Sequence, residues 1–129
     1  HVVDTARMAV FEAAARQPLA GLIFTVVHAA SSDDSWVDGV VETIERHGGE
    51  VCFVRLHCDP ALLLERVTAP ERTRYRKIKD PVKLQGVLES RDLFSPIPSR
   101  ESLSIDTATS SPREAALWIV THYRLPVPP

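Results

Sequence analysis

Long apolar runs, aromatic residues and positive net charge are all scarce in this chain of 129 residues. No apolar run reaches the roughly 18 residues of a membrane-spanning helix. The first ten residues include the charged Asp4 and Arg7, where a signal peptide needs an apolar segment. We therefore expect a cytoplasmic protein with no membrane partner. Only 6% of the residues are aromatic and the net charge is −2, whereas dedicated nucleic-acid binders usually carry a basic excess. Nucleic acid is therefore not expected to be the main partner.

Cysteine is also scarce, because the chain holds only Cys52 and Cys58. Both fall on one predicted strand, where six residues span about 20 Å, and a disulfide requires Cα atoms within about 7 Å. Two free thiols are expected, as is usual for a cytoplasmic protein. The sequence has no CxxC pair, so we assign no metal ligands.

Several common catalytic motifs are absent from these residues. The sequence contains no GxxxxGK[ST] or GxGxxG nucleotide-binding loop and no GxSxG nucleophile turn. What it does contain is an apolar fraction of 44%, enough for one compact core. We expect a single α/β domain over residues 1–125, followed by an extended tail at residues 126–129.

The periodicity of apolar residues predicts alternating helices and strands. Continuous apolar runs predict buried strands, and three helix starts carry capping signals, two as Asp-Pro and one as a Ser-Pro-x-Glu capping box. The expected helices cover residues 4–17 and 36–47 and begin again after Asp59, Asp80 and Ser111. The expected strands cover residues 22–27 and 50–58 and a short segment from Ser102 that ends near Asp106. This alternation predicts a parallel sheet with helices on both faces, a three-layer αβα architecture.

Ligands of open parallel sheets bind at the carboxyl ends of the strands. After the first predicted strand come His28, Asp33 and Asp34, which are suited to a substrate hydroxyl or to Mg²⁺; the alternative is that the aspartates only cap the next helix. After the third come Thr107, Thr109 and Pro112, in a loop of small residues before a helix. Such a loop can present backbone groups to a flat ligand or to phosphate, and Ser111 can cap the helix at the same time.

A basic run lies between the second and third strand ends. Its seven cationic residues are Arg66, Arg72, Arg74, Arg76, Lys77, Lys79 and Lys83. Arginine makes two-pronged contacts with phosphate, and three of the arginines alternate, which would align them on an extended loop. The run is interpreted as a phosphate site, with a solvated surface or an acidic or nucleic-acid partner as alternatives.

The order of these segments resembles the P-loop kinases. The resemblance is carried by "FEAAARQPLAGLIFTVVHA", "IERHGGEVCFVRLHCDPALLLERV", the arginine-rich segment and "SIDTATSSPREAALWIV", and it is greatest to small AAA-type ATPases and shikimate-kinase-like proteins. It implies ATP and Mg²⁺ as cofactors and transfer of the γ-phosphate to a hydroxyl. Residues 69–80 would form a lid.

Residue by residue, the resemblance implies three groups. The phosphates would be contacted by three lid arginines, Arg72, Arg74 and Arg76. The adenine side would be formed by Arg66, Thr107, Thr109 and Pro112. The phosphate acceptor would be faced by His28, Asp33 and Asp34. The family's first strand and its GxxxxGK[ST] loop would precede His1. We therefore expect these 129 residues to be the C-terminal part of a longer kinase-like protein, with little phosphotransferase activity alone.

The family's first strand is central in its sheet, so its neighbours would be left without a partner. We expect a homodimer or strand exchange to cover the gap. The alternative function is a non-catalytic α/β binding module whose basic segment docks an acidic partner or nucleic acid.

Overall fold

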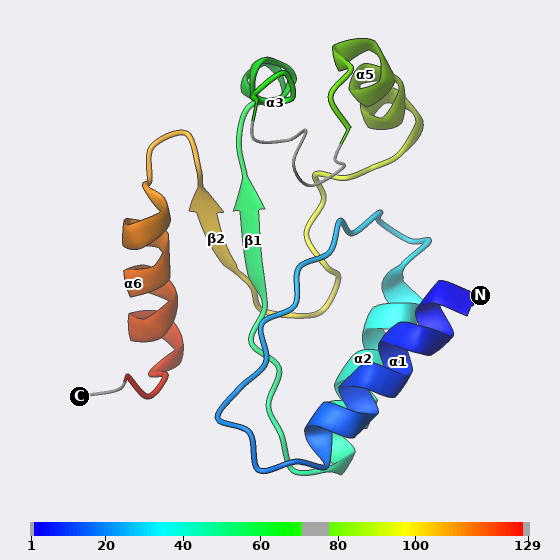
Figure 1. The fold of residues 1–129 in the computed structure, drawn as a ribbon, viewed down its shortest axis with the longest axis vertical. Coiled ribbons are helices and arrows are strands. Elements are labelled where there is room, and N and C mark those ends of the chain that lie inside the picture. Colours follow the sequence, from blue (N-terminus) through cyan, green and yellow to red (C-terminus); the bar gives the residue numbers. More distant parts are fainter. Residues whose placement is uncertain (1, 71–77, 128–129) are drawn as a thin grey trace. The chain divides into compact units, whose positions relative to one another are not determined.

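The structure is a computed structural model that describes residues 2–70 and 78–127 (Figure 1). It divides into two compact units, His1–Cys52 and Phe53–Pro129, which are described separately. The first contains helices α1 (Val2–Ala15) and α2 (Asp34–Arg46); the second contains β1 (Val54–His57), α3 (Pro60–Arg66), α5 (Pro81–Ser90), β2 (Leu103–Asp106) and α6 (Pro112–Tyr123). None of the helices in the described ranges has the length and apolarity that a membrane crossing requires.

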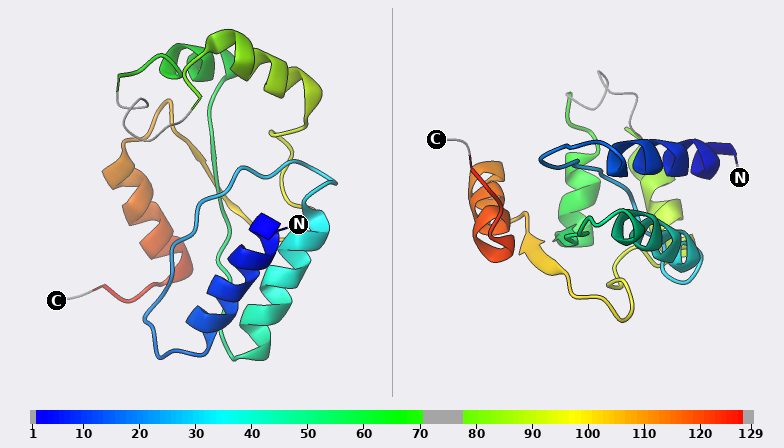
Figure 2. Two further views of the ribbon diagram at one scale, coloured as in Figure 1. Left: turned by 45° about the vertical axis from the view of Figure 1, so that its right-hand side comes forward. Right: turned by 90° about the horizontal axis from the view of Figure 1, so that it is seen from below.

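In the first unit α1 and α2 lie side by side and run in the same general direction (Figures 1 and 2). Both helices were predicted within two residues of their observed bounds. Phe11 of α1 and three valines of α2 are buried between them: Val37, Val40 and Val41. The ring of Phe11 makes T-shaped contacts with two other aromatic rings, those of Phe24 (centroids 4.8 Å apart) and Trp36 (6.2 Å).

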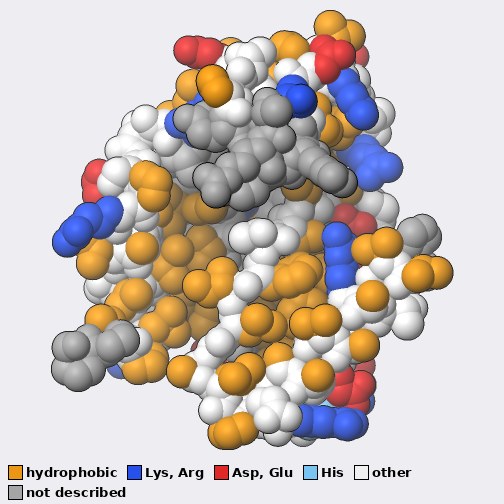
Figure 3. Space-filling view, in the orientation of Figure 1, with side chains coloured by type: hydrophobic (Ala, Val, Ile, Leu, Met, Phe, Trp, Pro, Cys, Tyr) orange, Lys and Arg blue, Asp and Glu red, His pale blue; other side chains and the backbone are white. Residues whose placement is uncertain are grey.

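The predicted strand at residues 22–27 is wrong, because this segment forms neither helix nor strand. A strand exists only by pairing, and the described part of the first unit holds no other extended segment that it could join. The two helices run the same way, so the chain between them must return about 20 Å, the length of a 13-residue helix. An extended chain of six or seven residues spans that distance. The run is also exposed rather than buried, with Ile23 93% and Val27 72% accessible, and apolar side chains lie at the surface in Figure 3.

The second unit holds a two-stranded parallel sheet, so the molecule mixes helices with parallel strands as predicted. β1 and β2 pair in the register Val54–Leu103 through His57–Asp106. The ladder extends by one bond at each end, because Leu103 N–H donates to Phe53 O (3.0 Å) and Thr107 N–H donates to His57 O (2.8 Å). Both strands have four residues; β1 is shorter than the predicted 50–58, whereas β2 ends at Asp106 as predicted.

The three capping predictions in this unit are confirmed. Asp59 accepts a hydrogen bond from Ala61 N–H at the start of α3 (2.8 Å), and Asp80 accepts one from Val82 N–H at the start of α5 (2.9 Å). Ser111 and Glu114 form the reciprocal capping box of α6. Each Asp or Ser precedes a proline at the first helical position, where proline needs no intrahelical partner.

The core of the second unit centres on Ile105 of β2 and Val67 after α3, each only 1% exposed. The α6 helix packs beside β2, and α3 lies beside α5 (Figures 1 and 2). The phenol of Tyr123 donates to Phe53 O, and Arg55 of β1 donates to Phe94 O. These contacts fix the sheet between its flanking segments, and they leave the carboxyl ends of β1 and β2 level with each other.

Candidate functional site

The carboxyl ends of β1 and β2 are joined by a side-chain contact between Arg66 and Thr107. Nη1 of Arg66 donates to the Thr107 hydroxyl and Nη2 donates to the Thr107 main-chain oxygen, both at 2.9 Å. Arg66 is the last residue of α3, which follows β1, and Thr107 directly follows β2. The two bonds therefore hold the guanidinium in one orientation at the sheet edge.

Thr107 is itself anchored to the end of β1. Its N–H donates to His57 O at 2.8 Å and its hydroxyl donates to the same oxygen at 3.2 Å. Further along the loop, the hydroxyl of Thr109 donates to Asp106 O (3.4 Å), and Pro112 begins α6. Of the four residues predicted on the adenine side, the structure brings Arg66 and Thr107 into contact. Thr109, in the loop between β2 and α6, and Pro112, at the start of α6, are exposed.

The three predicted lid arginines, Arg72, Arg74 and Arg76, lie outside the described residues. The described chain stops at Pro70 and resumes at Ile78. The prediction that these arginines contact phosphate therefore stays a prediction.

The three residues predicted to face the phosphate acceptor gather in the first unit: His28 and Asp33 lie in the segment before α2, and Asp34 is the first residue of that helix. Nε2 of His28 lies 2.9 Å from Oδ1 of Asp34, and Asp33 accepts a hydrogen bond from Ala29 N–H at 2.8 Å. Asp33 occupies the position before α2, but its side chain makes no capping hydrogen bond to the helix. The alternative reading, in which Asp33 only caps α2, is therefore not what the structure contains.

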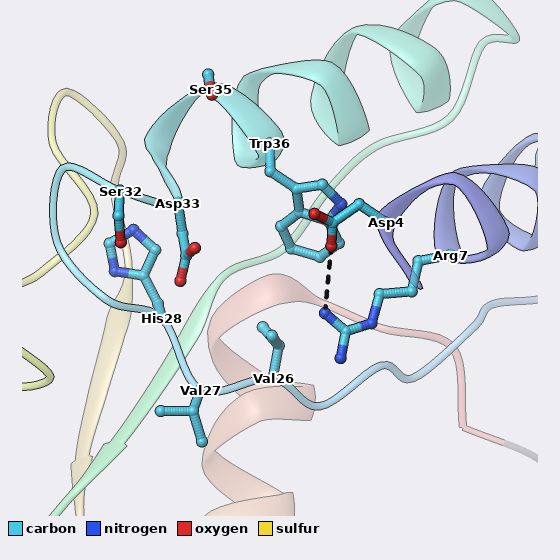
Figure 4. Close-up of a pocket in the computed structure, with 9 residues that line it drawn as sticks. All are labelled: Asp4, Arg7, Val26, Val27, His28, Ser32, Asp33, Ser35 and Trp36. Carbon is cyan, nitrogen blue, oxygen red and sulfur yellow. Dashed lines mark ion pairs between the residues drawn. The ribbon is translucent and has the colours of Figure 1, made fainter. Parts of the chain in front are cut away.

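A small cavity of about 160 Å³ lies beside this loop (Figure 4). Besides His28 and Asp33, its lining includes Asp4, Arg7 and Trp36, none of which was predicted as a site residue. Asp4 and Arg7 are three positions apart on α1, so they share a helical face, and Arg7 Nη1 lies 3.7 Å from Asp4 Oδ1. That spacing was visible in the sequence, but the proximity of α1 to the loop was not, because it depends on how the two helices pack.

Among the described residues, no group of three or more His, Cys, Asp or Glu side chains is arranged to hold a metal ion. Both cysteines are free. Partial burial, with the Glu50 carboxylate as a second cause, raises the pKa of the Cys52 thiol above its ordinary value. The raised pKa disfavours the thiolate, the form that acts as a nucleophile or metal ligand.

The chain matches no protein-family model, and comparisons with curated proteins and with solved structures gave no match either. The functional assignment therefore depends on the residues and contacts described above. Two arrangements carry it: the Arg66–Thr107 contact in the second unit and the His28–Asp34 loop with its cavity in the first.

Proposed function

We propose that the chain is part of an ATP-binding protein that transfers the γ-phosphate of ATP to a hydroxyl of a small molecule. The observation that carries this proposal is the Arg66–Thr107 contact at the carboxyl edge of two parallel strands. This edge is where open parallel sheets bind nucleotides and other ligands. The finer architecture, an incomplete P-loop kinase-like fold with three layers, belongs to the same proposal.

Arg66 is suited to the adenine side because two hydrogen bonds fix the plane of its guanidinium while the side chain stays exposed. An arginine held in this way can stack on a flat aromatic ring. The ring would lie between Arg66 and the loop after β2, with Thr109 and Pro112 as its other contacts. A fixed guanidinium loses little side-chain entropy on binding, which favours affinity.

The phosphate side of the proposed site is carried by Arg72, Arg74 and Arg76, with Mg²⁺ accompanying the ATP phosphates. Arginines stabilise the charge that develops on the phosphoryl oxygens during transfer. The GxxxxGK[ST] loop that would cradle the β- and γ-phosphates is not among these 129 residues. We therefore expect weak nucleotide binding and little or no transfer from this chain alone.

The acceptor side is the loop with His28, Asp33 and Asp34. In the proposed reaction the acceptor oxygen bonds to the γ-phosphorus as the bond from that phosphorus to the β–γ bridging oxygen breaks. The hydroxyl proton must pass to a base, and a carboxylate or an imidazole is the usual one. Asp33 and the His28–Asp34 pair supply these groups.

Nucleotide binding can be tested by an NMR titration of the chain with ATP and Mg²⁺, with adenosine as a separate probe of the base side. The proposal expects shifts at the amides of Arg66 and Thr107 with both probes. Arg66→Ala should weaken binding by about tenfold or more, the loss of one good charge-assisted contact. Arg91→Ala removes an exposed arginine elsewhere in the second unit and should leave binding unchanged.

A titration in which neither probe moves these signals would exclude an adenine site here. The phosphate side is tested by the double variant Arg72→Ala with Arg76→Ala. That variant should weaken ATP binding but leave adenosine binding as it was, because adenosine carries no phosphate. Equal ATP affinity in the double variant and the parent chain would show that these arginines do not bind phosphate.

A further inference from the structure

The cavity of the first unit has a definite charge arrangement. Figure 4 shows Asp4 and Arg7 on one side and His28 and Asp33 on the other, with Trp36 between them. All the residues that line it come from α1, from the segment before α2 and from the start of α2. It is therefore a feature of the first unit alone.

Among the described residues that line the cavity, Arg7 is the one arginine or lysine, and it already has partners. Its guanidinium lies 3.7 Å from the Asp4 carboxylate, and its central carbon lies 5.8 Å from the Trp36 ring centroid and 6.0 Å from that of Phe24. These distances are within the range of cation–π attraction. Arg7 therefore has less positive charge to offer an anionic ligand than a free arginine would.

The carboxylates outnumber the cation. Asp34 is engaged by His28 at 2.9 Å. One oxygen of Asp33, Oδ2, accepts from Ala29 N–H at 2.8 Å. The other oxygen of Asp33 accepts no hydrogen bond from the residues in the described ranges. Asp4 is paired with Arg7, so the carboxylate of Asp33 is the lining charge that has no arginine or lysine partner among the described residues.

Trp36 contributes to the wall of the cavity. Its indole nitrogen is buried and has no acceptor within the described part of the chain, and because it is closed off from solvent it is not a donor that a ligand in the cavity can use.

From these observations we infer that the cavity binds a small protonated amine. The ammonium group pairs with Asp33, and a hydroxyl on the same molecule is what the proposed phosphoryl transfer requires. The volume of about 160 Å³ is close to that of a cavity of about 150 Å³ that holds one benzene molecule. The ligand is therefore small, about six non-hydrogen atoms. The claim that this amine is the phosphate acceptor rests on the proposed function. The claim that the cavity binds a small amine does not.

Three two-carbon probes test which sign of ligand charge the cavity prefers: ethanolamine, ethylene glycol and glycolate. All three carry a hydroxyl, and they differ in whether the second group is cationic, neutral or anionic. The chain is titrated with each probe by two-dimensional NMR, without nucleotide. We expect ethanolamine to shift the amide signals of His28, Asp33 and Trp36 and to bind at least about tenfold more tightly than glycolate, since a charge-assisted hydrogen bond is exchanged for a repulsion.

A matched pair of variants locates the charge. Asp33→Asn keeps an oxygen that can accept from Ala29 N–H but removes the negative charge, and it should weaken ethanolamine binding by about tenfold or more. Glu42→Gln removes one negative charge from an exposed position of α2 outside the cavity, and it should leave binding unchanged. The probe series in the parent chain needs no variant, so it remains a test even if Asp33→Asn does not fold.

Three outcomes would overturn the inference: binding of glycolate as tight as that of ethanolamine, equal effects of the two variants, or no shift with any probe. The absence of nucleotide keeps the two proposals separate. Loss of ethanolamine binding with retained ATP binding would remove only the amine site. Ethanolamine binding without any ATP binding would leave the amine site and remove the kinase assignment.

Discussion

Arg66 donates two hydrogen bonds of 2.9 Å to Thr107, one to its hydroxyl and one to its main-chain oxygen. The two residues are 41 positions apart in the sequence, and they follow β1 and β2 respectively. The contact ties the end of α3 to the loop before α6. It also determines which way the face of the guanidinium points, which is the property that the proposed adenine site uses.

Replacing Arg66 by lysine should break this geometry while keeping the charge. Lysine cannot form the two-pronged contact of a guanidinium. We expect a loss of stability of at most about 1 kcal/mol, because the pair is exposed, with a larger effect on adenosine binding than on stability. Thermal unfolding and an adenosine titration measure the two effects. Tight adenosine binding in Arg66→Lys would mean that the orientation of Arg66 does not matter.

The Asp-Pro helix starts can be compared directly. Asp59→Ala removes the side-chain acceptor of Ala61 N–H, and Asp80→Ala removes that of Val82 N–H. Each should lower the free energy of unfolding by about 0.5–2 kcal/mol, the usual cost of losing an N-cap. Asp59→Asn and Asp80→Asn keep an acceptor and should cost little. Chemical denaturation gives the four values, and equal losses for alanine and asparagine would contradict the capping role.

Because the apolar run at residues 22–27 is exposed, we expect a charged substitution there to cost little stability. Ile23 is 93% exposed, so Ile23→Lys should change stability by no more than about 0.5 kcal/mol. Val37 is 4% exposed in α2, and Val37→Lys should destabilise the first unit by several kcal/mol, because it buries an unpaired charge. We also expect Ile23→Lys to reduce self-association in sedimentation experiments, since an exposed apolar segment favours association with other copies. A severe stability loss in Ile23→Lys would show that this segment is buried in solution.

Cys52 should react slowly with alkylating reagents. Burial, and secondarily Glu50, raises the pKa of its thiol, so less thiolate is present near pH 8 than in an unfolded chain. A raised pKa also means that the folded state holds the proton more tightly. The contribution of this thiol to the free energy of unfolding is therefore complete below the pKa of the unfolded chain, about 8.5. It is lost as the pH rises through the higher pKa of the folded state. The variant Cys58→Ser leaves Cys52 as the reacting thiol, and its alkylation rate is measured from pH 7 to 10 in the folded and the urea-unfolded chain. Adding Glu50→Gln should speed alkylation of the folded chain, because it removes the second cause of the raised pKa. Equal rates in the folded and unfolded forms would contradict the prediction.

Local sequence signals predicted the helices of this chain well. The Asp-Pro and Ser-Pro-x-Glu signatures act over three or four residues, and each helix that they mark begins where they indicate. The parallel order of the strands was also predicted, since helices between strands favour it, but which two strands pair was not. The run at residues 22–27 has the composition of a buried strand, yet a strand requires a neighbour, and composition does not specify one.

The residues of the candidate site were likewise predicted only in part. Arg66 and Thr107 were predicted on the same side of the site from the family resemblance, and the structure puts them in contact. Asp4 and Arg7 were not predicted, because their position next to Asp33 depends on the packing of α1 against α2. Sequence patterns describe one element at a time, whereas a cavity between elements depends on their separation and orientation.

The register of the sheet has a consequence for the order of events during synthesis. Val54 pairs with Leu103, about fifty residues later along the chain. At about 5–20 residues per second, the ribosome needs about 3–10 seconds to make the intervening segment. During this interval β1 has emerged without its partner, whereas α1 and α2 are already complete. We therefore expect the two helices to pack first, and the sheet to form only when the last quarter of the chain leaves the ribosome.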